Sequence, residues 1–202
     1  MHVNNSAAIG TTTFQDQGAS IMWKVDMKLF DADSDVYENC TNGEYIELNW
    51  HIHVGKSLDE QEVGADCGAT VGRPPVGGHY DPTFACGPYT EEVEACESLQ
   101  RVAGESYNYT CSPEAYETNS YACEVRDYSG KFGALRFRID KLANIAEIET
   151  KDIDDYGPKL NLIQDRAVVF HCGVPRVLCG TLSNVTSECT PAIKEKAEAD
   201  DI

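Results

Sequence analysis

The chain has 202 residues, of which 42% are hydrophobic and 25% are charged, as in an ordinary globular domain. Acidic residues outnumber basic ones by 34 to 16, which gives a formal net charge of −18. So negative a chain is a poor partner for nucleic acid or an anionic membrane, because both are polyanions. No run of 18 or more apolar residues is present, so the sequence predicts no helical membrane span.

Strand-like stretches dominate the chain, because β-branched, aromatic and alternating residues recur in short runs. We expect strands over residues 11–14, 21–30, 45–54, 133–139, 160–170 and 176–182. Turn signals at residues 41–43, 127–130 and 156–158 separate several of them. Short strands with turns between them predict an all-β antiparallel sandwich or barrel.

Residues 55–126 differ from this pattern, because they are rich in glycine and proline and hold five of the nine cysteines. We expect a long loop stapled by disulfides there, with a helical turn near residues 91–99. Residues 191–202 are charged and lack an apolar face, so they are interpreted as a linker or tail. Residues 1–190 then form one domain.

Nine cysteines, none in a CxxC pair, are more typical of disulfides than of a reduced intracellular protein or a zinc finger. Asn-x-Ser/Thr sequons for glycosylation occur at Asn4, Asn39, Asn108 and Asn184. Both features predict a secreted, extracellular glycoprotein. An odd number of cysteines requires at least one that is free or paired between chains.

Four histidines stand at marked positions. His51 and His53 are one residue apart on an expected strand, so their side chains share one face. His79 follows two glycines, and His171 ends the apolar stretch AVVFH. A solvated sheet face is the more common explanation of such a pair by itself, and a lone histidine is usually structural. Taken together, the four favour a shared metal site.

Five motifs in order give these histidines a context. HIHVG (residues 51–55), GGHYDP (77–82), CEVRDYSGKFG (123–133), AVVFH (167–171) and RVLC (176–179) follow one another along the chain. In this order they resemble the landmarks of the copper–zinc superoxide dismutase superfamily, and the resemblance covers residues 8–182. It implies a Greek-key β-sandwich or barrel with a long disulfide-stapled loop.

The resemblance also assigns roles to single residues. His51, His53, His79 and His171 match the family's copper ligands, with His79 at the place that bridges copper and zinc. Arg176 matches the arginine that receives superoxide. Cys67 and Cys179 match the disulfide that ties the long loop to the barrel. For the other cysteines we expect the pairs Cys111–Cys123 and Cys40–Cys189.

Departures from the family pattern are equally informative. No histidine lies between His79 and His171, so of the family's zinc ligands only Asp127 remains. Glu124 stands where the last zinc histidine would, and a carboxylate there can orient His79 in place of the metal. Only four residues separate His171 from Arg176, which leaves no room for the family's electrostatic loop and predicts a site open to water. These absences resemble the copper-only members, although Arg126 and Phe132 depart from their motif.

The resemblance therefore implies dismutation of superoxide to oxygen and hydrogen peroxide, with one copper and no zinc per chain. Glu124 and Asp127 would support the ligands, and His79 would pass a proton to the product. The alternative is an extracellular structural or copper-binding repeat module with vestigial activity, whose partners would be neighbouring repeats. A zinc hydrolase is less favoured, because four histidines leave no open position on zinc.

Overall fold

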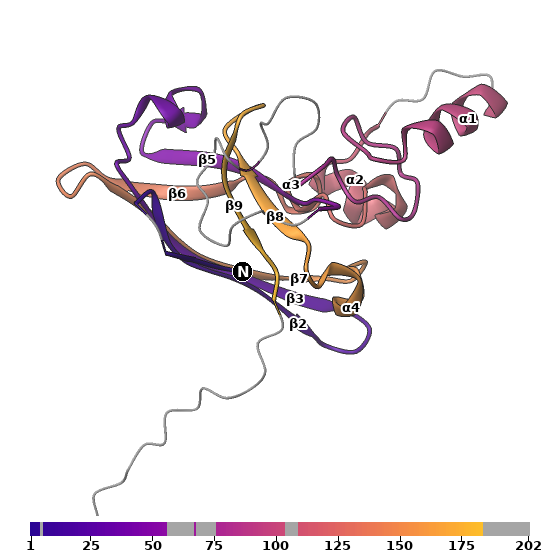
Figure 1. The fold of residues 1–202 in the computed structure, drawn as a ribbon, viewed down its shortest axis with the longest axis horizontal. Coiled ribbons are helices and arrows are strands. Elements are labelled where there is room, and N and C mark those ends of the chain that lie inside the picture. Colours follow the sequence, from indigo (N-terminus) through magenta and orange to yellow (C-terminus); the bar gives the residue numbers. More distant parts are fainter. Residues whose placement is uncertain (5, 56–66, 68–75, 104–108, 184–202) are drawn as a thin grey trace, which may run out of the picture.

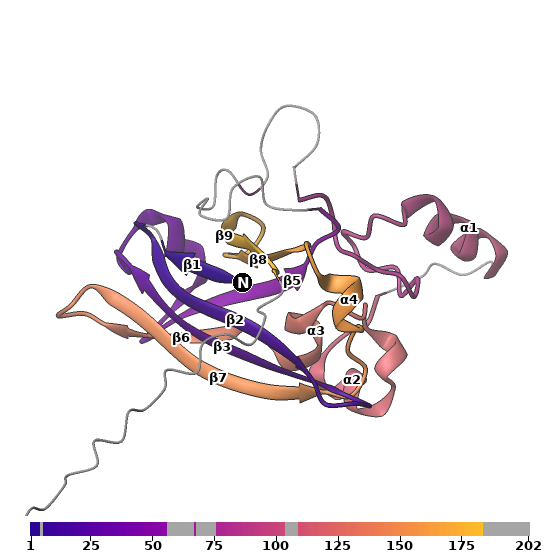
Figure 2. The same ribbon diagram turned by 60° about the horizontal axis from the view of Figure 1, so that its bottom comes forward.

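The computed structural model describes residues 1–4, 6–55, 67, 76–103 and 109–183, and its main element is an antiparallel nine-stranded sheet. The strands are β1 (His2–Asn4), β2 (Ala8–Asp16), β3 (Ile21–Phe30), β4 (Thr41–Asn42), β5 (Tyr45–Ile52), β6 (Leu135–Asp140), β7 (Ile145–Asp154), β8 (Ala167–His171) and β9 (Arg176–Thr181). Their order is β1-β2-β3-β7-β6-β5-β8-β9, with β4 added beside β5. Because β1 contacts β9, the sheet nearly closes into a barrel (Figures 1 and 2). The predicted all-β fold is confirmed.

Strand β5 joins the two halves of this barrel. Its residues 45–48 pair with β6, whereas its residues 49–52 pair with β8. The neighbours β3–β7 and β5–β8 are not consecutive in sequence, as in Greek-key connections. The C-terminal end of β5 lies beside the beginning of β8, since the N–H of His53, the residue after β5, donates to the Ala167 carbonyl (2.9 Å).

Alternation along β5 decides which side chains enter the core. Ile46, Leu48, Trp50 and Ile52 are fully buried, whereas Glu47, Asn49 and His51 point to the opposite face. The Trp50 ring lies 5.0 Å from the Trp23 ring and 4.6 Å from the Tyr128 ring, measured between centroids. Phe132 extends the same aromatic cluster, with its ring centroid 5.3 Å from that of Trp23. Core packing therefore orients His51 away from the barrel interior.

Helices gather in the long loop, at one end of the sheet (Figure 1). They are α1 (Val93–Ala103), α2 (Pro113–Thr118), the 3-10 turn η3 (Ser120–Ala122) and α3 (Tyr128–Phe132). The predicted helical turn over residues 91–99 is confirmed as the beginning of α1. The turn expected over residues 127–130 is wrong: Asp127 caps α3, since its side chain accepts the Gly130 N–H.

Two strand predictions need correction. Residues 160–170 do not form one strand, because Leu160–Ile163 is the short helix α4 and only Ala167–His171 is β8. Strand β7 was not predicted at all, since half of its ten residues are charged and leave few apolar positions to mark it. Its ten residues pair one to one with β3, so the neighbouring strand determines it. A further 3-10 helix, η1 (Asp35–Cys40), precedes β4.

Four disulfides staple the described residues: Cys40–Cys172, Cys67–Cys179, Cys86–Cys96 and Cys111–Cys123. The predicted pairs Cys67–Cys179 and Cys111–Cys123 are confirmed. The predicted pair Cys40–Cys189 is wrong, because Cys40 bonds to Cys172, the residue after β8. Residue 189 itself lies outside the described residues. Four disulfides agree with an extracellular protein.

The described helices include none with the length and apolar composition of a membrane span. Of the predicted glycosylation sites, Asn39 is exposed, whereas Asn108 and Asn184 lie outside the described residues. The predicted domain end at residue 190 also lies outside them.

Candidate metal centre

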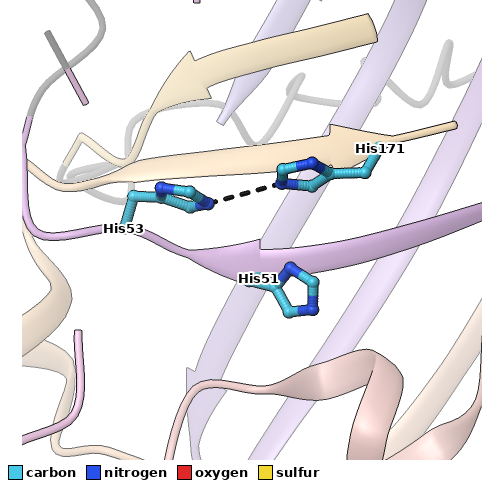
Figure 3. A group of neighbouring side chains, drawn as sticks. All are labelled: His51, His53 and His171. Atoms are coloured by element: carbon cyan, nitrogen blue, oxygen red, sulfur yellow. Dashed lines mark hydrogen bonds between the residues drawn. The ribbon is translucent and has the colours of Figure 1, made fainter. Parts of the chain in front are cut away.

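Three of the predicted ligands meet on one face where the second half of β5 pairs with β8. Their nearest ring nitrogens, one each from His51, His53 and His171, all lie within 4.8 Å of one another. Nε2 of His53 is 3.4 Å from Nε2 of His171, as Figure 3 shows. Two strands far apart in the chain thus bring three imidazoles close enough together to be a candidate metal site.

His79 borders this group without belonging to the three-residue cluster. Its backbone forms an isolated β-bridge with His53, which holds the loop against the end of β5. The His79 ring lies 4.1 Å from the His51 ring and 5.2 Å from the His53 ring, centroid to centroid. All four predicted histidines therefore occupy one site, with His79 on its loop side.

Each imidazole has one nitrogen held by another group. The contacts are His51 Nε2 to Asp127 Oδ1 (3.2 Å), His53 Nδ1 to the Gly77 carbonyl (2.9 Å), His79 Nδ1 to Glu124 Oε2 (2.8 Å) and His171 Nδ1 to the Val174 carbonyl (3.3 Å). Such contacts fix the ring and leave its other nitrogen for a metal. Nδ1 of His51 is buried and has no hydrogen-bond partner among the described residues. That orphaned nitrogen fits a metal ligand.

Burial also puts these rings in the state that a metal needs. It lowers the pKa of His51 and His53 well below 6.5, and the neighbouring imidazoles lower both further. It lowers the pKa of His171 to about 4. At neutral pH these three rings are therefore uncharged and can donate a lone pair.

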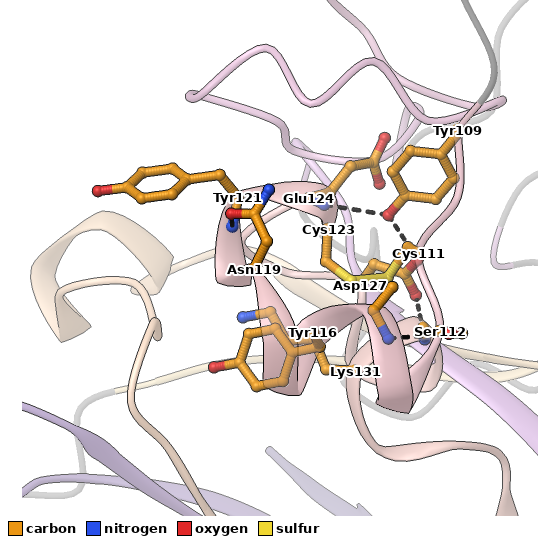
Figure 4. The surroundings of a disulfide bond; sticks show 12 residues. Tyr109, Cys111, Ser112, Tyr116, Asn119, Tyr121, Cys123, Glu124, Asp127 and Lys131 are labelled. Atoms are coloured by element: carbon orange, nitrogen blue, oxygen red, sulfur yellow. Dashed lines mark hydrogen bonds between the residues drawn. A yellow bond between two sulfur atoms is a disulfide. The ribbon is translucent and has the colours of Figure 1, made fainter.

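Asp127 and Glu124 are linked through a residue that the sequence analysis missed. Tyr109 donates its hydroxyl to Asp127 Oδ2 (2.8 Å), and the same hydroxyl accepts the Glu124 N–H (3.0 Å), as Figure 4 shows. Burial raises the pKa of Tyr109, so the hydroxyl keeps its proton. The only feature of the sequence that pointed to Tyr109 was its position two residues before Cys111 of the Cys111–Cys123 disulfide.

Glu124 is 1% exposed, and its contact with His79 is the one expected from the sequence. Burial raises the pKa of this carboxyl group, while the hydrogen bond from His79 opposes that rise. The Glu124 carboxylate therefore stands where it can orient His79, although this role stays a prediction.

Arg176 lies beside the site at the start of β9 and is half-buried. Its guanidinium donates to the carbonyl groups of Cys67 (3.1 Å) and Gly77 (2.8 Å). The Gly77 carbonyl also contacts His53, and the charge of Arg176 lowers the pKa of both His53 and His171. Arg176 thus combines a positive charge near the histidines with a role in holding the loop backbone.

The connection between His171 and Arg176 is only a turn, closed by the Cys172 N–H on the Pro175 carbonyl (3.0 Å). The rings themselves are largely buried, since His53, His79 and His171 are 9% exposed or less. His51 is the most accessible, with 13% of its side chain exposed. Among the described residues these rings are therefore mostly shielded from water, whereas the sequence predicted an open site.

Elsewhere in the described residues, Asp81, Cys86 and Cys96 also converge. Cys86 and Cys96 form a disulfide, however, so neither offers a thiolate to a metal. Asp127, which the resemblance matched to a zinc ligand, contacts His51 and Tyr109. The histidine group is thus the one candidate metal centre that the described residues offer.

Searches of protein-family models and of curated protein sequences found no match to this chain. Three neutral imidazoles with a fourth histidine beside them suit zinc, copper, iron or nickel.

Proposed function

We propose that the chain is a superoxide dismutase that uses one copper and no zinc. The observation that carries this proposal is the group of His51, His53 and His171 with His79 beside it, each ring held at one nitrogen by a group outside the cluster. The other nitrogens of His53 and His171 face each other at 3.4 Å. Two carboxylates, Glu124 and Asp127, hold rings that a second metal would otherwise help to orient. The five ordered motifs support the choice of copper and of superoxide.

Bound copper would supply the redox chemistry, oxidising one superoxide to oxygen and reducing the next, with two protons, to hydrogen peroxide. Nδ1 of His51 and Nε2 of the other three rings are the atoms left to hold it. Nε2 of His79 would carry one proton to the product while Glu124 fixes the ring. Arg176 would attract the anion by its charge.

Copper-loaded protein is expected to contain one copper and no specific zinc per chain, and to accelerate superoxide decay. The measurement is metal analysis after dialysis against both ions, together with a decay rate that scales with bound copper. A His51→Gln variant should lose both the copper and the rate. Stoichiometric zinc beside copper, or copper binding without faster decay, would contradict the proposal.

Substitution of Glu124 by glutamine is expected to weaken copper binding by about 10- to 100-fold, the scale seen for groups that orient metal ligands. Glutamine keeps the shape of the side chain, but it removes the charge that holds Nδ1 of His79. The measurement is competition for copper against a chelator of known affinity.

Glu114, an exposed residue of α2, provides the matched control. Its replacement by glutamine removes the same charge from the same loop, and copper affinity should not change. Equal affinities for Glu124→Gln and Glu114→Gln would show that Glu124 does not take the place of a second metal.

The Arg176→Ala variant is expected to slow superoxide decay about tenfold, or about 1.4 kcal/mol, while copper stays bound. Rates should be compared at matched copper loading and low salt, where steering of an anion is strongest. Arg138→Ala, which removes an exposed arginine of β6, is the control for net charge. An unchanged rate in Arg176→Ala would mean that superoxide reaches the site unguided.

A copper-binding structural module is the second candidate function. It is favoured by the hydrogen bonds of Arg176 to the Cys67 and Gly77 carbonyls, which give that arginine a structural role without any substrate. Copper bound with the predicted stoichiometry but with no effect on superoxide decay would support the module over the enzyme.

A further inference from the structure

Arg126 is a charged residue buried without a partner. The residue is only 1% exposed. None of its atoms Nε, Nη1 and Nη2 has a hydrogen-bond partner among the described residues. The contact that it does make is with an aromatic ring, since its Cζ lies 3.6 Å from the centre of the Tyr80 ring. A guanidinium carries five N–H donors, and burying them unpaired is costly.

A second guanidinium adds to this positive charge. Cζ of Arg166 also lies 3.6 Å from the centre of the Tyr80 ring. Arg166 donates to the carbonyl groups of Leu162 and Val54, so it is already anchored. Burial, together with Arg166, lowers the pKa of Arg126 to about 9, a value at which it remains charged at neutral pH.

The buried carboxylates of the described residues are engaged elsewhere. Asp81 accepts backbone N–H groups of its own loop, Glu124 accepts from His79, Asp127 from Tyr109 and Gly130, and Asp154 from Lys131 and Tyr116. None of them contacts Arg126. A buried cation that keeps its charge and has no carboxylate beside it needs a negative partner from solution.

We propose that Arg126 forms an internal binding site for a small monovalent anion, of the size of chloride or nitrate. The guanidinium supplies charge-assisted hydrogen bonds, the Tyr80 ring forms one wall, and Arg166 contributes a second positive charge. A small single charge suits the site, since only Arg126 has free donors. This site is separate from the histidines and does not depend on the proposed activity.

The place of Arg126 in the chain suggests what the anion stabilises. Arg126 lies between Glu124 and Asp127, the residues that hold His79 and His51, and its carbonyl accepts the Ile52 N–H (3.2 Å). An anion bound to its side chain would fix this segment against the end of β5.

The test is the salt dependence of unfolding of the full chain with its disulfides intact. A chelator removes metal, so that anions cannot bind to it, and urea unfolding is followed in sodium chloride, sodium nitrate or sodium gluconate at equal ionic strength. Relative to gluconate, chloride and nitrate should raise the folding equilibrium constant until the site is saturated. At an anion concentration of 100 times its dissociation constant, the expected increase is about 100-fold. Arg126→Met should lose this response, and Arg138→Met, at an exposed arginine, should keep it.

In gluconate, Arg126→Met should be at least as stable as the parent, because methionine needs no counterion. A bromide-soaked crystal of the parent protein should also show anomalous density beside Arg126, which decides the matter if the variant does not fold. The same anion response in Arg126→Met and the parent, or no bromide at Arg126, would overturn the proposal and leave water as the partner of this side chain.

Discussion

Replacement of Asp154 by alanine is expected to lower the free energy of unfolding by about 3 to 5 kcal/mol, because it leaves a buried ammonium group without its counterion. Nζ of Lys131 lies 2.9 and 3.1 Å from the two carboxylate oxygens of Asp154, and both side chains are fully buried. Burial lowers the pKa of Lys131, and Asp154 opposes that change. The measurement is urea unfolding at pH 7.

Two comparisons make this result specific. Glu149, the exposed partner of Lys24, should be replaceable by alanine with no measurable loss. The double variant Lys131→Met with Asp154→Leu should be more stable than Asp154→Ala alone, since it buries no unpaired charge. If Asp154→Ala lowers the free energy of unfolding by less than about 1 kcal/mol, the Lys131 ammonium group does not need Asp154. Its hydrogen bonds to the carbonyls of Val125 and Tyr156 would then be sufficient.

The salt bridge also bears on the metal centre. Lys131 donates to the carbonyl of Val125, the residue next to Glu124. Asp154→Ala is therefore expected to loosen the segment that holds His79 and His51, so copper affinity should fall together with stability.

The metal-free protein is expected to lose stability as the pH falls from 7.5 to 5.5. Burial lowers the pKa of His51, His53 and His171 in the folded chain, whereas the unfolded chain takes up protons near pH 6.5. The unfolded state then binds more protons, so stability is fully present above about pH 6.5 and decreases below it. Each histidine lowers the free energy of unfolding by up to about 1.4 kcal/mol for each pH unit.

This loss is measured as the urea midpoint of metal-free protein at half-unit pH steps. For His171 the loss should end near pH 4, where the folded form also takes up a proton. His171→Gln should remove one histidine's share of the slope. A midpoint that is flat between pH 7.5 and 5.5 would show that the folded chain accommodates charged imidazoles at this site.

The sequence by itself determined the fold class and the metal-site candidates. Alternation predicted β3 and β5 because side-chain direction along a strand depends only on position. The same rule put His51 and His53 on one face, and the ordered motifs added His79, His171 and Cys67–Cys179. Each of these inferences uses local periodicity or a known pattern, which a sequence carries without its structure.

The tertiary structure decided the contacts between distant segments. Strand β7 forms because it pairs with β3, and Cys40 bonds to Cys172 because η1 leads into β4, which lies beside β5 and so near the end of β8. A hairpin or helix can be predicted from its own residues, but a partner 132 residues away depends on how the whole barrel closes.

The charged groups around the site show most clearly the difference between what the sequence determines and what the tertiary structure decides. The sequence shows that Glu124, Arg126 and Asp127 lie within four residues of one motif, but it does not show their contacts. In the structure Glu124 contacts His79, Asp127 contacts His51, and Arg126 is buried against Tyr80. Tyr109 reaches Asp127 from a separate loop. The role of a polar side chain depends on which partners surround it once water is excluded, and only the folded chain determines those partners.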